Sequence, residues 1–271
     1  MKKTMKILAA ILALMLLIPA VMAENDGSLQ YILDKGELIL GLDDTFPPMG
    51  YRDEETNEII GYDIDLAKEV CARLGVKLVC QPIDWSAKEL ELAEKNIDCI
   101  WNGMSITPER QESMSLSIAY MNNKIVLVAK NTAGYTSIQD LKNKTIAVQS
   151  GSFAEEVLET YEQYADIYSK VTVQPFDEYL TALMDLQKGG VDAVLIDLVV
   201  AEFRIAGLGD DSLVVVDELE DDLYGIGFRK ADVELRDKVN AILQEMAADG
   251  TIAKISEKWF GKDISIVGTA E

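Results

Sequence analysis

One arginine stands out as a side chain that could hold a small anion. Arg110 ends the segment NGMSITPER, which directly follows an apolar, strand-like run. Its planar guanidinium can grip a carboxylate through two parallel hydrogen bonds. Thr107 and Pro108 suit the cap and first position of a helix, so Gly103 and Ser105 are expected in a loop at the carboxyl end of a strand, facing a ligand. A surface ion pair is the commoner role for such an arginine, but an acidic chain that holds an anion needs a fixed cation.

Two further polar groups directly follow predicted strands. Ser152 with Glu155 matches a capping box, which would place a hydroxyl and free N–H groups at a helix start. Asp197 ends an apolar run and could accept hydrogen bonds from an ammonium group. Each has a structural alternative: Ser152 only caps its own helix, and Asp197 caps the helix predicted over 198–205.

A fourth segment, LDDTFPP, again follows a predicted strand. Phe46 and the more distant Trp85 could form apolar walls for the side chain of a ligand, and Asp43 could supply a polar contact. The alternative for either aromatic residue is ordinary core packing.

Short apolar strands alternate with helical stretches along most of the chain, which is typical of parallel α/β sheets. The strands are predicted at residues 37–42, 76–80, 97–101, 125–130, 145–149, 191–196 and 224–229. The helices are predicted at 63–74 (capped by Asp63), 87–95, 152–164, 177–188, 233–249 and 252–259. Residues 91–101 and 185–195 repeat one order of helix, break and strand, and no flexible linker separates them, so two similar α/β lobes are expected.

The first 23 residues have the three parts of a secretory signal. Three lysines precede an apolar run over residues 7–18, and small residues lead to Ala23. This run is shorter than the roughly 20 residues that a membrane span needs, so cleavage near Ala23 and an exported, soluble protein are expected. An uncleaved anchor is the alternative.

The charge of the chain excludes several kinds of partner. Lys and Arg number 25 and Asp and Glu 47; removing the signal takes away three lysines and no acid, which leaves 22 and 47, or net −25. Such a surface repels nucleic acid and anionic membranes. Any anion site must therefore be local.

The content of cysteine and histidine predicts neither a metal site nor a cofactor. Histidine is absent from the chain, and Cys71, Cys80 and Cys99 form no CxxC pair. All three cysteines are interpreted as small buried hydrophobic residues, with one disulfide among them as the alternative.

These segments together resemble the polar amino acid binding proteins of bacterial ABC transporters, the family 3 solute-binding proteins. The resemblance covers roughly residues 29–261 and depends on the order and spacing of its motifs. They are DDTFPP at 43–48, GYDIDLA at 61–67, GMSITPER at 103–110, QSGS at 149–152, DAVLID at 192–197, YGIGF at 224–228 and KWFG at 258–261.

The resemblance implies an α/β fold of the type II periplasmic binding protein kind, with two lobes, each a mostly parallel sheet flanked by helices, joined by two hinge strands. The expected boundaries are 28–119 with 225–263 for lobe 1, 125–219 for lobe 2, 120–124 and 220–224 for the hinge crossings, and 264–271 for a C-terminal tail.

The resemblance also assigns roles to residues. Arg110 would hold the α-carboxylate of an amino acid with Ser105 and Ser152, and Asp197 would take the α-ammonium with the carbonyl of Gly103. Phe46 and Trp85 would enclose the side chain, with Asp43 and Gln149 near its tip. Asn102, Phe153 and Ile196 depart from the usual residues of the family, so the ligand cannot be copied from a relative. The expected ligand-binding residues are Asp43, Phe46, Trp85, Asn102, Gly103, Ser105, Arg110, Gln149, Ser152, Phe153, Asp197 and Tyr224.

The expected function is therefore capture of a free polar L-amino acid, with a basic or neutral polar side chain, by a monomer that delivers it to an ABC transporter permease. Two alternatives remain. Some relatives with this fold are cyclohexadienyl dehydratases that use a carboxylic acid in the cleft, and others are sensor modules detached from a kinase or channel.

Overall fold

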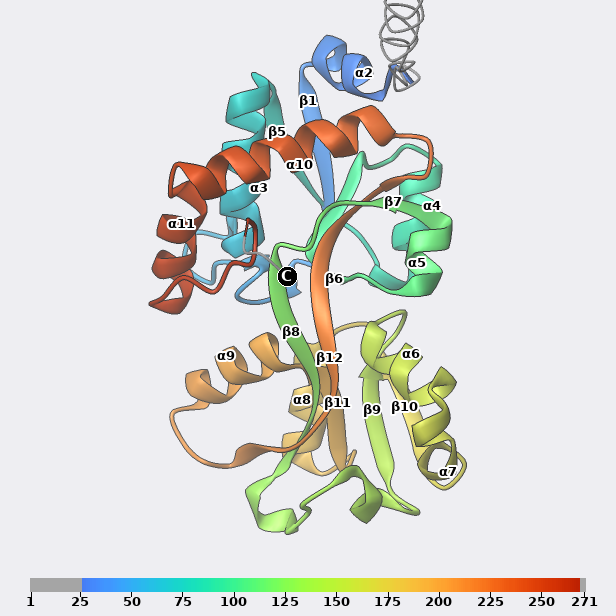
Figure 1. Ribbon diagram of the computed structural model, residues 1–271. Helices are drawn as coiled ribbons and strands as arrows, with labels where there is room; N and C mark the ends of the chain where they lie inside the picture. Colours follow the sequence, from blue (N-terminus) through green and yellow to red (C-terminus); the bar gives the residue numbers. More distant parts are fainter. Residues whose placement is uncertain (1–25, 269–271) are drawn as a thin grey trace, which may run out of the picture.

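The computed structural model describes residues 26–268 and shows two lobes, one above the other in Figure 1. The predicted signal peptide lies outside the described residues. Within them a sheet of nine strands runs through both lobes in the order β10-β9-β11-β8-β12-β6-β1-β5, with β7 (Met114–Leu116) beside β12. Each lobe thus contributes its own part of one continuous sheet.

The upper lobe is built on β1 (Glu37–Leu42), β5 (Lys77–Pro82) and β6 (Cys99–Ser105), which are parallel. Helices α3 (Tyr62–Leu74) and α11 (Thr251–Phe260) lie on one side in Figure 1, and α4 (Lys88–Ala93) and α5 (Pro108–Ser113) on the other. The lobe also contains α2 (Ser28–Lys35), α10 (Val233–Ala248), the 3₁₀ turn η1 (Trp85–Ala87) and a small sheet of β2 (Thr45–Phe46), β3 (Gly50–Arg52) and β4 (Ile59–Ile60).

The lower lobe repeats this plan with the parallel strands β9 (Thr145–Gln149), β10 (Thr172–Phe176) and β11 (Ala193–Asp197). Its helices are α6 (Phe153–Thr160), α7 (Ala165–Tyr168), α8 (Tyr179–Lys188) and α9 (Leu198–Leu208). Short 3₁₀ turns lie at Asn131–Ala133, Ile138–Leu141 and Glu162–Tyr164.

Two antiparallel strands pass from one lobe into the other. They are β8 (Met121–Lys130) and the long β12 (Leu213–Arg229), which run side by side through the centre of Figure 1. Between the lobes Tyr224 pairs with Met121 and Asp221 with Lys124. The two predicted crossings therefore lie beside one another.

The predicted strands at 37–42 and 145–149 are confirmed with their bounds as β1 and β9. The prediction that Asn102 to Ser105 form a loop is wrong, because β6 continues through Ser105 by pairing with β12. Helix α6 ends at Thr160, four residues before the predicted end, and a 3₁₀ turn follows. Strand β10 and the small sheet were not predicted.

The prediction that Asp63 caps its helix is also wrong. Helix α3 begins one residue earlier and Gly61 takes the cap position without a side-chain hydrogen bond. A Cβ on Gly61 would lie 2.1 Å from the carbonyl oxygen of Met49, so only glycine fits there. Asp63 is instead fully buried, and its carboxylate accepts hydrogen bonds from the Gly103 N–H at 2.7 Å and the Tyr120 hydroxyl at 3.0 Å.

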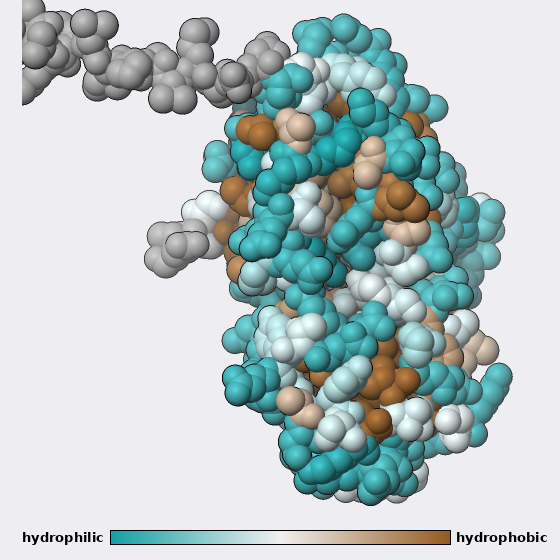
Figure 2. Space-filling view, turned by 90° about the vertical axis from the view of Figure 1, so that its right-hand side faces the viewer, coloured by the Kyte–Doolittle hydropathy of each residue, from teal (hydrophilic) through white to brown (hydrophobic). Residues whose placement is uncertain are grey.

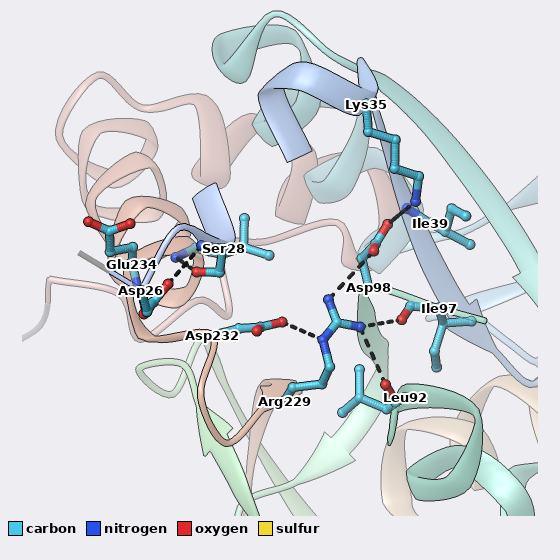
Figure 3. Close-up of polar contacts among 11 residues, drawn as sticks. Asp26, Ser28, Lys35, Ile39, Leu92, Ile97, Asp98, Arg229, Asp232 and Glu234 are labelled. Atoms are coloured by element: carbon cyan, nitrogen blue, oxygen red, sulfur yellow. Dashed lines mark hydrogen bonds and ion pairs between the residues drawn. The ribbon is translucent and has the colours of Figure 1, made fainter. Parts of the chain in front are cut away.

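A buried ion-pair network fixes the end of the upper lobe that faces away from the lower one (Figure 3). The fully buried Asp98 carboxylate accepts hydrogen bonds from Lys35 and from the Ile39 N–H, both at 2.8 Å, and lies 3.6 Å from Arg229. Arg229 pairs in turn with Asp232 at 2.6 Å. Three elements, α2, β1 and β12, thereby meet at one carboxylate, which directly precedes β6.

The core of each lobe consists of apolar side chains that alternate along these strands and face the helices, such as Leu38 and Leu40 in β1. Cys71 and Cys99 are buried as expected, whereas Cys80 is only half-buried; none of the three forms a disulfide. Within residues 26–268, no helix has the length and apolar character to span a membrane.

Candidate functional site

The ends of four strands meet where the two lobes face each other. Ser105 is the last residue of β6, Gln149 of β9 and Asp197 of β11, while Asp43 directly follows β1. The Nε2 atom of Gln149 donates a hydrogen bond to Oδ2 of Asp43 at 2.7 Å, which joins the two lobes directly. Polar side chains from both lobes therefore meet in the space between the lobes.

Arg110 lies in this space with only 5 % of its surface exposed. Thr107 caps helix α5 by accepting a hydrogen bond from the Arg110 N–H, and Pro108 takes the first helical turn, both as predicted. The guanidinium donates to the Ser105 carbonyl at 3.0 Å and to the Gly151 carbonyl of the other lobe at 3.3 Å. No carboxylate among the described residues forms a contact ion pair with it, and burial lowers its pKa. Its hydrogen-bond partners are therefore neutral carbonyls, and the carboxylates of Glu89, Glu156, Asp197 and Asp222 act on it only at longer range.

Asp197 does not cap helix α9 with its side chain. Its Oδ1 accepts hydrogen bonds from the Tyr224 hydroxyl at 2.7 Å and from Asn123 Nδ2 at 2.8 Å. Burial, with the nearby charge of Asp222, raises the pKa of Asp197 to about 7. The capping alternative is therefore not seen, and this carboxylate lies between the lobes beside the two joining strands.

Asp222, on β12, was missed by the sequence analysis although it lies in one of the two predicted crossings. It is buried and accepts hydrogen bonds from the Ser105 hydroxyl and from Asn123 Nδ2, each at 2.9 Å. Asn123 thus bridges two carboxylates, Asp197 and Asp222. Asp222 also neighbours several acids in sequence, and this run gave no sign that one of them is buried.

Gly103 has a positive φ of 59° inside strand β6. A Cβ added there would lie 2.7 Å from the Phe46 ring and 3.1 Å from the Tyr224 ring. Glycine therefore lets two aromatic side chains approach the backbone beside Asp197. The Asp63 carboxylate fixes this residue from behind through its hydrogen bond to the Gly103 N–H.

Asp43 lies at another part of the same space and is 6 % exposed. Its Oδ1 accepts hydrogen bonds from the backbone and hydroxyl of Thr45, and its backbone N–H donates to Asn102 at 3.1 Å. The Nδ2 atom of buried Asn102 has no hydrogen-bond partner within the described residues. Burial raises the pKa of Asp43.

Further acids lie near Asp43: Asp44 and Glu178 are half-buried, and Asp177 is exposed. Burial raises the pKa of Glu178, and the negative charges of Asp43, Asp44 and Asp177 add to that effect. Two cations lie close to these groups: Arg52 forms an ion pair with Asp44, and Arg204 donates to the Thr45 carbonyl at 2.9 Å. Four carboxylates from two lobes therefore lie near two guanidiniums, and the local charge remains negative.

The predicted capping box at Ser152 is only half formed. The hydroxyl accepts a hydrogen bond from the Glu155 N–H at 3.1 Å, as predicted. The Glu155 carboxylate accepts instead from the Gly151 N–H at 2.7 Å, one residue earlier than a capping box requires. Phe153 is buried and packs edge-on against Tyr161, with ring centroids 6.0 Å apart.

Phe46 and Trp85 are both buried but lie in different clusters of side chains. Phe46 packs against Tyr179 of the other lobe at 6.0 Å between ring centroids. Trp85 contacts the ammonium of Lys88, 5.2 Å from its ring centroid. No ring contact joins Phe46 to Trp85 in the part of the chain that the structure describes.

Hydrophilic side chains cover most of the face in Figure 2, as the acidic composition predicts, and paler side chains lie at the level where the lobes meet. Among residues 26–268, no group of three or more acidic or cysteine side chains is arranged to hold a metal ion.

Comparison with known proteins agrees with this geometry. Residues 38–262 match the family described as bacterial extracellular solute-binding proteins, family 3. The L-cystine-binding protein TcyJ of Escherichia coli is 30 % identical over 243 residues, which cover 89 % of each chain. The arginine-binding extracellular protein ArtP of Bacillus subtilis is 31 % identical over 228 residues, or 83 % of this chain and 87 % of that one.

Solved structures agree as well. A substrate-binding protein of an ABC uptake transporter from Streptococcus pneumoniae, with bound histidine, matches with a TM-score of 0.85 and 34 % identity over 89 % of this chain and 99 % of that one. The ancestral amino acid-binding protein AncCDT-1, a precursor of cyclohexadienyl dehydratase, matches with a TM-score of 0.78 and 32 % identity over 86 % and 99 %. The expected fold and the expected class of function are confirmed. This chain, with its two lobes and a charged space between them, belongs to the family 3 bacterial extracellular solute-binding proteins and is an amino acid-binding protein.

Proposed function

We propose that this protein captures a free L-amino acid with a basic side chain and delivers it to the permease of an ABC transporter. The observation that carries the proposal is the opposite charge at the two ends of the space between the lobes. Arg110 lies at one end without a contact ion pair, and near the other end four carboxylates outnumber the two guanidiniums of Arg52 and Arg204. A basic amino acid has its charges in the matching order.

The backbone groups of the ligand account for the first end. Its α-carboxylate would replace the carbonyls that Arg110 now contacts, because a charge-assisted hydrogen bond is stronger than a neutral one. Its α-ammonium would lie on Asp197, whose carboxylate already faces the same space from the other lobe. Ser105, Ser152 and the Gly103 carbonyl would complete this end.

The side chain of the ligand would extend toward Asp43. The pKa of Asp43 is raised by burial, and a cationic group beside it would offset the cost of burying its negative charge. Gln149 now donates to that carboxylate and would share it with the ligand. The rings of Phe46 and Trp85 would flank the apolar stem, with Asn102, Phe153 and Tyr224 shaping the rest of the pocket.

We further propose that binding draws the lobes together about the paired strands at 120–124 and 220–224, between lobe 1 (28–119 with 225–263) and lobe 2 (125–219). A ligand shifts such an equilibrium only by its preference for one form, so contacts made by both lobes at once must supply the shift. The protein would act outside the cytoplasm as a monomer, after cleavage of its signal near Ala23.

A thermal-shift screen of the twenty amino acids with ornithine and cystine tests the choice of ligand. At a hundredfold excess over Kd, the best ligand should raise the melting temperature by roughly 5–10 °C. Arginine, lysine or ornithine should give the largest shift, and citrulline, which matches arginine in length but is neutral, a much smaller one. In the variant Asp43→Asn, the thermal shifts given by arginine and by citrulline should differ less than they do in the unaltered protein. A largest shift with glutamate or aspartate would contradict the charge argument.

A cyclohexadienyl dehydratase activity is a second candidate only because of the ancestral relative. Asp197, with a pKa of about 7, is the carboxylic acid that such a reaction would use. In the present proposal this group binds an ammonium instead and performs no catalysis. Incubation with prephenate or arogenate should therefore release no aromatic product.

A further inference from the structure

Lys88 is a buried lysine whose charge has no contact ion pair in the described residues. It is 4 % exposed, at the first position of helix α4. Its Nζ donates hydrogen bonds to the Trp85 carbonyl at 3.2 Å and, across the lobes, to the Gly151 carbonyl at 2.9 Å. Two neutral carbonyls and the Trp85 ring offset little of the free-energy cost of burying an ammonium group.

Lys88 and Arg110 share an acceptor. The Gly151 carbonyl that Lys88 contacts also accepts from the Arg110 guanidinium, at 3.3 Å. Both residues line one cavity of about 310 Å³ together with Ser152, and its rim carries the glutamates at 89, 109, 155, 156 and 159. Two cations of the upper lobe therefore converge on one neutral oxygen of the lower lobe, beside a hydroxyl at the start of helix α6.

The close packing of this junction leaves little freedom to either cation. A Cβ on Gly151 would lie 3.1 Å from the Cα of Ser86 and 3.2 Å from the Nζ of Lys88. Because the loop before Ser152 is in contact with helix α4, Lys88 can reach the lower lobe only when the two lobes meet as they do here. The Lys88 ammonium can therefore act on the lower lobe only while the two lobes are in contact.

We propose that Lys88 is a second cation of the ligand site and that it binds the α-carboxylate of the amino acid together with Arg110. This inference rests on the proposed function, and it adds a specificity-determining residue that the motifs of the chain did not point to. Two fixed cations favour a ligand with a free carboxylate over its amide or its decarboxylated amine. Because both cations also contact the lower lobe, binding of the ligand carboxylate would depend on the contact between the two lobes.

The charged groups that face Lys88 come from three helices. Arg110 on α5 repels it, while Glu89 on its own helix and Glu155 and Glu156 on α6 attract it at longer range. Burial outweighs these acids and lowers the pKa of Lys88 to about 8. Without an anion beside it, the ammonium is therefore strained by desolvation, and a ligand carboxylate would relieve that strain.

The rival explanation is that Lys88 only latches the lobes through the Gly151 carbonyl. The two roles differ in their response to pH. A latch buries its charge without an anion, so the neutral amine suits it better and its benefit to binding grows as the pH rises through about 8. A partner of the ligand carboxylate needs its charge, so its benefit stays constant or shrinks over the same range.

The test uses calorimetry with the member of the amino acid panel that gives the largest thermal shift on the unaltered protein. Lys88→Met keeps the length and apolar stem of the side chain and removes the charge. Lys77→Met removes an exposed lysine of β5 as the matched control. Affinities are measured at pH 7.0 and pH 9.5, and each is compared with that of the unaltered protein, so titration of the ligand cancels.

Lys88→Met should bind at least about tenfold more weakly at pH 7.0, with a deficit that does not grow at pH 9.5, and Lys77→Met should match the unaltered protein. An unchanged affinity of Lys88→Met, or a deficit that grows with pH, would overturn the inference and leave the proposed function standing. If no member of the panel binds the unaltered protein, the proposed function fails and this inference fails with it.

Discussion

At the scale of single residues, Arg110 carries the largest share of the proposed binding energy. Two charge-assisted hydrogen bonds to a carboxylate contribute about 1.5–3 kcal/mol each. Arg110→Ala should therefore weaken amino acid binding by at least about a hundredfold in calorimetry. The melting temperature of the ligand-free protein should not fall by much, because a buried guanidinium held by two carbonyls adds little to stability.

The control for this variant is Arg236→Ala, which removes a partly exposed arginine of α10 that pairs with its neighbour Asp237. It should change neither affinity nor stability appreciably. An Arg110→Ala protein that still binds with full affinity would remove the central assignment of the site.

Asp197 should make binding depend on pH. Its pKa, raised to about 7 by burial and by Asp222, means that its carboxylate must lose a proton before it can bind an ammonium. Affinity should fall by about tenfold per pH unit once the pH is below that value. In Asp197→Asn, binding should be severely weakened and this dependence should disappear, which calorimetry at pH 5.5 and pH 8 would measure.

The same variant tests the effect of Asp197 on stability. A raised pKa in the folded protein means that the protonated form is favoured there, so the contribution of Asp197 is complete below its unfolded value of 3.8 and is lost as the pH rises through about 7. Asp197→Asn resembles the protonated form. Its ligand-free melting temperature at pH 8 should therefore equal or exceed that of the unaltered protein; a large decrease would indicate a structural role instead.

The sequence did not predict the roles of two other buried residues, Asp63 and Lys88. Asp63 has the sequence position of a helix cap, and the group that it binds, the N–H of Gly103, lies 40 residues away. Lys88 lies in a helix rich in charged residues, where nothing marks it as buried. Such roles depend on contacts between residues far apart in the chain, which no local pattern contains.

At the scale of elements, the network around Asp98 fixes the upper lobe far from the ligand site. Asp98→Ala would leave Lys35 and Arg229 without their shared carboxylate and the Ile39 N–H without its partner. Loss of one partner of a buried pair typically costs 3–5 kcal/mol, and the partial exposure of both cations reduces this to about 3 kcal/mol. Denaturant unfolding should show this loss, while ligand affinity at low temperature stays unchanged.

The matched control is Asp237→Ala, which removes an exposed carboxylate paired with Arg236. It should cost less than about 0.5 kcal/mol. Equal stability of the two variants would mean that the Asp98 network does not hold these elements together.

Elements with strong local signals were predicted well. Strand β1 consists of apolar residues between a helix end and a polar loop, and β9 ends at a helix cap, so both had clear limits. The end of β6 was missed because its last residues are held by β12, more than a hundred residues later in the chain. Strand β10 is largely exposed and contains a proline, so its partner β9 defines it more than its own sequence does.

At the scale of the whole molecule, both lobes supply charged groups to the space between them. The upper lobe provides Arg110 and Asp43, and the lower lobe provides Asp197. The rule that ligands bind at the carboxyl ends of parallel strands predicted polar groups at these strand ends, and Ser105, Gln149 and Asp197 lie there. That the two edges face each other required the long strands β8 and β12, whose continuity the sequence did not reveal.

The most direct test is a crystal structure of the protein grown with the amino acid that gives the largest thermal shift. We expect the α-carboxylate within hydrogen-bond distance of the Arg110 guanidinium, the α-ammonium on Asp197, and the end of the side chain beside Asp43. A guanidinium still bound to the Ser105 and Gly151 carbonyls, with the amino acid elsewhere, would contradict the account.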